Sequence, residues 1–213
     1  MSTLLLRLAG PMQSWGTDSK FDVRRTQCEP SKSGVIGLVA AAMGIRRDEK
    51  EALIPLSALR FGVRVDREGV MLRDYHTAKS QKSAYVTNRY YLADAVFVVG
   101  LESNNAELLD EIALALQKPA FPLYLGRRSC PPIGRVFLEI SEKPLEDALK
   151  ENAPKEATRI VVDAKPDEAG GLVHDVPVSF DSAKREYSYR RIKEEFIHAN
   201  EEIDHDPMAE LED

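Results

Sequence analysis

The chain has 213 residues, of which 43% are hydrophobic, and its formal net charge is −6 at pH 7. That composition allows one large or two small domains with a real core, and no apolar run approaches the roughly 20 residues that span a bilayer, so no membrane contact is expected. The two cysteines, Cys28 and Cys130, form no Cys-x-x-Cys pair, which argues against a zinc site and favours a cytoplasmic protein with free thiols.

The N-terminal half alternates strand and helix signals. Its predicted elements are a strand at 3–9, a small-residue helix at 31–44, a shorter helix at 48–59, and paired strands at 60–66 and 70–76. Ser31 or Ser33 caps the first helix, whereas Pro55 disturbs the second. The segment 77–91 is polar and basic with interspersed tyrosines, and we expect it to leave the sheet and return.

The remaining elements complete an α+β pattern. They are an apolar strand at 93–101, an amphipathic helix at 104–117, a strand at 135–141, a short helix at 145–151, and strands at 158–163, 173–180 and 186–192. The order β-α-β-β-α-β is that of a ferredoxin-like domain, which we place at residues 1–142. The last three strands predict a small C-terminal β subdomain over 143–193.

The end of the chain is strongly acidic. Residues 194–213 hold nine Asp or Glu and no Lys or Arg, which leaves 29 basic and 26 acidic residues elsewhere. The net charge of the whole chain argues against a nucleic-acid partner. The rest of the chain is mildly basic, however, so the uneven distribution of charge permits such a partner. Polarity and the lack of an apolar face predict a flexible tail, with a contact to a partner protein as the alternative.

The loop Gly126-Arg127-Arg128-Ser129 carries the clearest chemistry. Glycine lets the backbone turn sharply, and a proline pair stiffens the exit. Two guanidinium groups, a hydroxyl and backbone N–H groups then lie in one patch, which suits phosphate binding. An ordinary basic surface loop is the alternative.

Polar side chains after the first strand extend this chemistry. A base stacked on Trp15 is worth about 1–3 kcal/mol, while Gln13 and Ser14 are placed to hydrogen-bond base edges or phosphates. The alternative is that Trp15 closes the end of the core.

A further group of candidates precedes and begins the first helix: Arg24, Arg25, Lys32 and Ser33. A helix start with free N–H groups attracts anions, so phosphate contacts are predicted here. The spacing does not match the Gly-x-x-x-x-Gly-Lys-Ser/Thr loop that binds nucleoside triphosphates. A capped surface helix is the alternative.

The predicted strand 70–76 ends in Arg73, Tyr75 and His76. Together with Lys79, this set offers metal-independent cleavage of RNA by general acid–base catalysis. Strand alternation sends Tyr75 and His76 to opposite faces, however, and a single histidine in a strand is more often a structural or ligand-contact residue.

The basic segment that follows mixes cations with aromatic rings and contains no acids: Lys79, Lys82, Tyr85 and Arg89. This mixture suits a nucleic-acid backbone with stacked bases, and a solvated loop is the alternative. The other histidines of the chain form no metal-like cluster, so neither a metal nor a cofactor is expected.

Four sequence blocks occur in a characteristic order. They are Leu-Arg-Leu-Ala-Gly-Pro-Met-Gln-Ser-Trp-Gly at 6–16, Ser-Gly-Val-Ile-Gly-Leu at 33–38, Leu-Arg-Asp-Tyr-His-Thr at 72–77, and Tyr-Leu-Gly-Arg-Arg-Ser-Cys-Pro at 124–131. With these blocks the chain resembles the CasD-like, family-five CRISPR-associated proteins of type I-E Cascade complexes. The resemblance runs to about residue 140, and the C-terminal third matches only loosely.

The resemblance implies a non-catalytic repeat-associated (RAMP) protein with a ferredoxin-like, RRM-related domain and a β-hairpin thumb at about 77–92. Such a subunit grips and caps the 5′ handle of the CRISPR RNA in antiviral defence. It abuts a CasC-like backbone subunit and a CasA-like large subunit, and it meets target DNA only through the complex. Carried over to this chain, the RNA-binding residues are Gln13, Ser14, Trp15, Arg24, Arg25, Lys32, Ser33, Arg73, Tyr75, His76, Lys82, Arg89, Gly126, Arg127, Arg128 and Ser129.

Two other functions remain open at this point. A related subtype uses its family-five protein as the endoribonuclease that processes repeat RNA, so a metal-independent nuclease with His76, Tyr75 and Lys79 is one alternative. The other is a scaffold, in which protein contacts carry the function.

Overall fold

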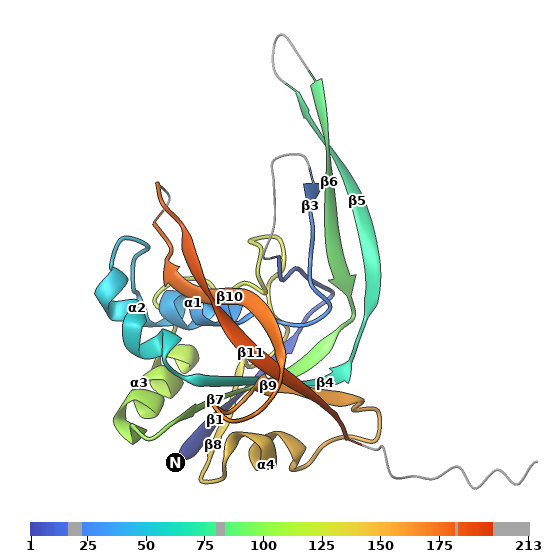
Figure 1. Ribbon diagram of the computed structural model, residues 1–213. Helices are drawn as coiled ribbons and strands as arrows, with labels where there is room; N and C mark the ends of the chain where they lie inside the picture. Colours follow the sequence, from blue (N-terminus) through green and yellow to red (C-terminus); the bar gives the residue numbers. More distant parts are fainter. Residues whose placement is uncertain (17–22, 80–83, 182, 198–213) are drawn as a thin grey trace, which may run out of the picture.

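The computed structural model describes residues 1–16, 23–79, 84–181 and 183–197. It is an α+β fold, as the sequence predicts, with two β-sheets and four short helices in that part of the chain. None of these helices is long and apolar enough to cross a membrane. Figure 1 shows a long hairpin that projects away from the main sheet.

The main sheet is antiparallel throughout, with the strand order β10-β11-β9-β4-β7-β1-β8. Its strands are β1 Ser2–Ala9, β4 Arg60–Arg67, β7 Val96–Ser103, β8 Phe137–Ser141, β9 Arg159–Asp163, β10 Gly171–Ser179 and β11 Glu186–Phe196. The second sheet contains β2 Met12–Gln13, β3 Val23–Arg24, β5 Val70–Lys79 and β6 Ala84–Ala93. The helices are α1 Lys32–Met43, α2 Lys50–Ser57, α3 Ala106–Gln117 and α4 Leu145–Lys150.

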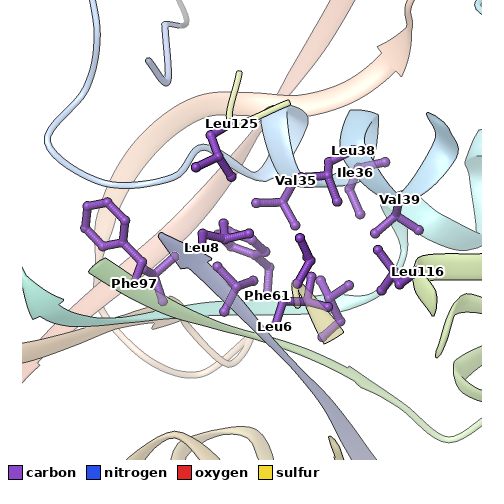
Figure 2. Close-up of a cluster of buried hydrophobic side chains, with 14 of the residues drawn as sticks. Leu6, Leu8, Val35, Ile36, Leu38, Val39, Phe61, Phe97, Leu116 and Leu125 are labelled. Carbon is purple, nitrogen blue, oxygen red and sulfur yellow. The ribbon is translucent and has the colours of Figure 1, made fainter. Parts of the chain in front are cut away.

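The side chains of β1 alternate between two apolar clusters. Leu6 and Leu8 join Phe61 of β4 and Ile36 of α1 in the larger cluster, which Figure 2 shows between the strands and α1. Leu5 points to the opposite face of the sheet and packs with α4. Because successive strand residues face opposite sides, one strand supplies both layers of the core.

Helix α1 begins and ends where the sequence predicts. The Ser31 hydroxyl accepts a hydrogen bond from the backbone N–H of Gly34, and Gly44 ends the helix with a φ of 79°. Gly34, Gly37 and Ala41 are half-buried, and their spacing places them on one face of the helix. Since these residues have little or no side chain, that face of α1 is a shallow surface of backbone.

The strand predicted at 70–76 does not join the main sheet. β5 pairs with β6 along its whole length, so the hairpin begins at Val70, before the predicted thumb, and β7 takes the place beside β4. Gly69 turns the chain with a φ of 74°, and Val70 and Leu72 beyond it stay exposed. The apolar alternation that suggested pairing with β4 therefore belongs to a two-stranded projection, which lies beside β3 in Figure 1.

The C-terminal strands extend the main sheet. β9 pairs with β4, and β11 pairs with β9, so the expected C-terminal subdomain has no sheet of its own. β11 runs to Phe196, which corrects the prediction that a flexible tail starts at 194. Glu194 and Glu195 form ion pairs with side chains of β9 and α4, and these pairs anchor the end of the strand. Residues 198–213 lie outside the described part of the chain.

Glu146 links α4 to the main sheet and makes the fold sensitive to acid. The Arg60 guanidinium donates two hydrogen bonds to the Glu146 carboxylate, at 2.8 and 2.5 Å. These bonds lower the pKa of Glu146 from 4.5 to about 2. A carboxylate with a depressed folded-state pKa adds stability above its unfolded-state pKa and loses that contribution as the pH falls to the folded-state value.

We therefore expect the free energy of unfolding to fall between pH 4.5 and 2, and Glu146→Gln to flatten that dependence. Urea unfolding at several pH values measures the effect, and Glu142→Gln, a change at an exposed carboxylate, is the control. An acid dependence that is the same in wild type and in Glu146→Gln would contradict the expectation.

Candidate nucleic-acid interface

A groove of about 700 Å³ lies over the shallow face of α1. Gly34, Gly37 and Ala41 of that helix line it, together with the loop after α3, the segment after α1 and the β10–β11 hairpin. Its volume is within the range of roughly 300–1,000 Å³ that is usual for ligand sites. Five aromatic residues belong to the lining, and one of them, Trp15, is buried: Trp15, Phe121, Tyr124, Phe180 and Tyr187.

The lining of the groove is cationic. It includes four arginines and, among the described residues, no acid: Arg46, Arg47, Arg128 and Arg185. Within the described part of the chain none of these four guanidinium groups forms an ion pair, whereas Arg60, Arg159 and Arg190 of the main sheet each pair with two or more carboxylates. Guanidinium groups that form no ion pair attract phosphate-bearing ligands, even on a chain of net charge −6.

The loop that carries Arg128 is held in a conformation that requires glycine. Gly126 has a φ of 85°, and a Cβ on it would lie 1.8 Å from the carbonyl oxygen of Ser14. The Ser14 N–H donates to the Leu125 carbonyl at 3.1 Å, and the Leu125 N–H donates to the Cys130 carbonyl at 2.7 Å. Cys130 is buried, and burial raises the pKa of its thiol, so Cys130 anchors the loop as an unreactive packed group.

The two arginines of this loop have different surroundings. Arg127 donates to the backbone carbonyl of Arg24 at 2.8 Å, and its guanidinium lies 4.8 Å from the centre of the Tyr91 ring. Burial alone raises the pKa of Tyr91, but hydrogen bonds with Ser129 and Arg127 bring it below its ordinary value. Arg127 and Ser129 thus tie the loop to β6, whereas Arg128 is exposed and lines the groove.

Gln13 and Trp15 are core residues. The Trp15 indole N–H donates to the Gln13 side-chain oxygen at 3.0 Å, and Gln13 donates in turn to two backbone carbonyls. Trp15 is 1% exposed, and a Cβ on Gly34 would lie 2.8 Å from its ring. The predicted base stacking on Trp15 does not fit this burial, because the ring has no free face. Ser14 is also buried, and its hydroxyl donates to a carbonyl of β6.

The N-terminus of α1 is already occupied by a carboxylate. Asp175 accepts a hydrogen bond from the Lys32 backbone N–H at 2.8 Å, and the Lys32 ammonium pairs with Asp163 at 3.1 Å. Arg190 donates to both carboxylates and completes a buried charge network. Burial lowers the pKa of Lys32, and Asp163 opposes that shift. These contacts give no support to the predicted phosphate contact of Lys32, whereas Ser33 does line the groove.

The candidates on the hairpin lie apart from the groove lining. The Arg73 guanidinium lies 4.6 Å from the centre of the Tyr75 ring, on one face of the hairpin. His76 faces the other side and pairs with Asp74. The alternative catalytic set of Tyr75, His76 and Lys79 is thus divided between two faces, as strand alternation predicts.

The structure gathers only some of the predicted residues. Those that line the groove are Ser14, Trp15, Ser33, Gly126 and Arg128. Those that are described but do not line it are Gln13, Arg24, Arg25, Lys32, Arg73, Tyr75, His76, Arg89, Arg127 and Ser129. Lys82 lies outside the described residues.

Sequence reasoning missed three arginines and four aromatic residues of the groove lining: Arg46, Arg47, Arg185, Phe121, Tyr124, Phe180 and Tyr187. The basic pair Arg46-Arg47 directly follows α1, and its place after a helix of small residues was a usable signal. Arg185 has no such signal in the sequence. It stands between Lys184 and Glu186, so the sequence shows only a short run of mixed charges, and these two neighbours pair with each other. Only the tertiary fold brings that segment to α1.

Comparisons with known proteins identify relatives over most of the chain. The profile of a family described as CRISPR-associated protein (Cas_Cas5) matches residues 3–193. A protein of Escherichia coli (strain K12) named CRISPR system Cascade subunit CasD is 40% identical over an alignment of 157 residues, and the match covers 64% of this chain and 70% of that protein.

Two solved structures are similar in sequence and in fold. One, described as a Cas protein, is 42% identical with a TM-score of 0.72, and the match covers 92% of this chain and 94% of the other. The second, from a CRISPR RNA-guided surveillance complex, is 38% identical with a TM-score of 0.76, and the match covers 91% and 89%.

Proposed function

Because this chain belongs to the CRISPR-associated protein family (Cas_Cas5), we propose that it is the subunit of a type I-E Cascade surveillance complex that grips and caps the 5′ handle of the CRISPR RNA. The name of the E. coli relative and the source of the second solved structure support membership of such a complex. A CasC-like backbone subunit and a CasA-like large subunit are its proposed neighbours, and target DNA is met only through the assembly.

The groove over α1 is the observation that carries the RNA-binding proposal. The guanidinium groups of its four arginines form no ion pair among the described residues, although the chain as a whole is acidic. Single-stranded RNA offers phosphates for such groups and unstacked bases for aromatic rings, and the lining supplies both kinds of partner. Arg128 is the loop residue that we assign to a phosphate, while Arg127 and Ser129 hold the loop in place.

We further propose that the middle of the main sheet is a ferredoxin-like, RRM-related unit with the β5–β6 hairpin as its thumb. The strand order β4-β7-β1-β8 and the positions of α1 and α3 between these strands in the chain support that assignment. The candidates on the thumb, Arg73, Tyr75, His76 and Arg89, then contact RNA or neighbouring subunits from the two faces of the hairpin.

The proposed role is binding without catalysis. Tyr75 and His76 face opposite sides of the hairpin, so a cleavage mechanism that needs both on one phosphate has no support from their geometry. The endoribonuclease alternative predicts that the full chain cuts CRISPR repeat RNA in EDTA and that His76→Ala stops the cutting. We expect no product from either protein.

Replacing Arg128 with alanine tests the binding proposal. The probe is a single-stranded RNA that carries the 5′ handle of the host CRISPR RNA, and its affinity for the full chain is measured by fluorescence anisotropy at several salt concentrations. A lost charge-assisted contact weakens binding by about 1.5–3 kcal/mol, and the slope of log K against log salt decreases by roughly 0.7. Arg135→Ala, at an exposed arginine outside the groove lining, is the matched control. Equal affinities for wild type and Arg128→Ala would refute the proposal.

A further inference from the structure

The end of the β10–β11 hairpin where the two strands are joined lines the groove. Phe180, Arg185 and Tyr187 line the groove beside the floor formed by α1. The Phe180 ring lies 3.6 Å from the position that a Cβ on Gly37 would occupy, so the hairpin meets the shallow face of the helix directly. Figure 1 shows β10 and β11 curving over α1. This segment belongs to the C-terminal third, where the sequence offered no binding residue.

The hairpin is held firmly against the body. The Asp175 carboxylate of β10, which is 1% exposed, accepts from the Lys32 N–H of α1 and from the Arg190 guanidinium of β11. The Ser57 hydroxyl donates to the Pro177 carbonyl at 2.8 Å, which links the hairpin to α2. These contacts fix the hairpin to both helices, so its groove-lining residues stand on a rigid support.

Arg185 and Tyr187 are the two hairpin side chains with the chemistry for binding RNA. Lys184 pairs with Glu186 at 2.5 Å, while Arg185 between them has no ion pair within the described residues and is exposed. The Tyr187 ring is half-buried and meets the His174 ring edge-on, with 6.1 Å between centroids. A guanidinium without an ion pair and an aromatic ring are the two kinds of partner that single-stranded RNA uses.

We infer that the β10–β11 hairpin is an RNA-contacting wall of the groove, in which Arg185 binds a phosphate and Tyr187 stacks on an unpaired base. This inference rests on the proposed function and adds to it the part of the chain that the sequence resemblance matches only loosely. The RNA then contacts two separate parts of the chain. One is the loop after α3 that carries Arg128, and the other is the C-terminal hairpin, which Asp175 joins to the start of α1.

Arg185→Ala and Tyr187→Ala test the inference with the same single-stranded handle RNA and the full chain. Each variant is expected to weaken binding by about 10-fold, and Arg185→Ala also lowers the salt dependence. Tyr187→Phe keeps the ring and is expected to bind as wild type does. Arg191→Ala is the matched control, because Arg191 is an exposed arginine of the same strand outside the groove lining. Unchanged thermal midpoints establish that the variants fold.

The outcomes separate this inference from the proposed function. Loss of affinity in Arg185→Ala and Tyr187→Ala, with Arg191→Ala unaffected, supports the RNA-contacting hairpin. Wild-type affinity in both hairpin variants, together with weakened binding in Arg128→Ala, overturns the inference and leaves the proposed function intact. Wild-type affinity in all three overturns both.

Discussion

Replacing Gly126 with alanine is expected to destabilise the fold by roughly 2–5 kcal/mol and to abolish handle binding. The left-handed backbone at φ 85° costs an alanine about 1–2 kcal/mol. The added Cβ would also lie 1.8 Å from the Ser14 carbonyl oxygen, so the loop must move away from the segment after β1, at a further cost of about 1–3 kcal/mol. The midpoint of urea unfolding, at unchanged slope, measures the loss of stability.

Gly134→Ala is the matched control for this prediction. Gly134 also has a positive φ, 76°, but a Cβ there would meet nothing within 4 Å. Gly134→Ala should therefore destabilise the protein only by the cost of the left-handed backbone, about 1–2 kcal/mol, and should leave RNA binding unchanged. Equal losses of stability in the two variants would contradict the prediction, because they would show that the close approach of Ser14 to Gly126 does not add to the destabilisation.

Asp175→Ala is expected to destabilise the protein by about 3–5 kcal/mol, because it removes one partner from a buried charge network. The Arg190 guanidinium loses two hydrogen bonds, at 2.6 and 2.9 Å, and the Lys32 N–H loses its acceptor. The hairpin is then released from α1, so binding of handle RNA should weaken even at temperatures where the variant is folded. Thermal unfolding and anisotropy on the same samples measure the two effects.

Two variants sharpen that experiment. Glu195→Ala removes an ion pair with Lys150 whose side chains are 40–46% exposed, and such a pair contributes no more than about 1 kcal/mol. Asp175→Asn keeps an acceptor for the Lys32 N–H and should recover part of the RNA affinity. A variant Asp175→Ala as stable as Glu195→Ala would contradict the assignment of a buried network.

Much of the fold is readable from local patterns, and the exceptions have a common cause. The strand at Ser2–Ala9 and the helix capped by Ser31 are specified by nearby residues, and both lie where expected. The alternation at 70–76 was misread because it reports only that a strand exists. Which strand it pairs with depends on the direction that the chain takes after Gly69, and no local pattern encodes that direction.

The candidate site was predictable only where one loop carries its own chemistry. The position of Arg128 in the groove lining agrees with the sequence prediction, because a glycine and a run of polar residues indicate an exposed polar loop. Lys32 and Trp15 contact Asp163 and Gln13, and local sequence patterns could not predict these contacts, because they depend on the tertiary structure. Arg185 was missed for the opposite reason. Its proposed role depends on its having no ion pair among the described residues, whereas its neighbours Lys184 and Glu186 pair with each other.

The acid-free lining of the groove has a kinetic consequence. An approaching RNA meets, on average, a repulsive field from a chain of net charge −6, while the unpaired arginines create a local attraction. Under the proposed function, encounters elsewhere on the surface are therefore brief, and those at the groove persist long enough for docking. The proposed function then implies that orientation is selected during approach, before any base is contacted. Added salt shortens the reach of this steering, which at physiological ionic strength extends over a Debye length of about 8 Å.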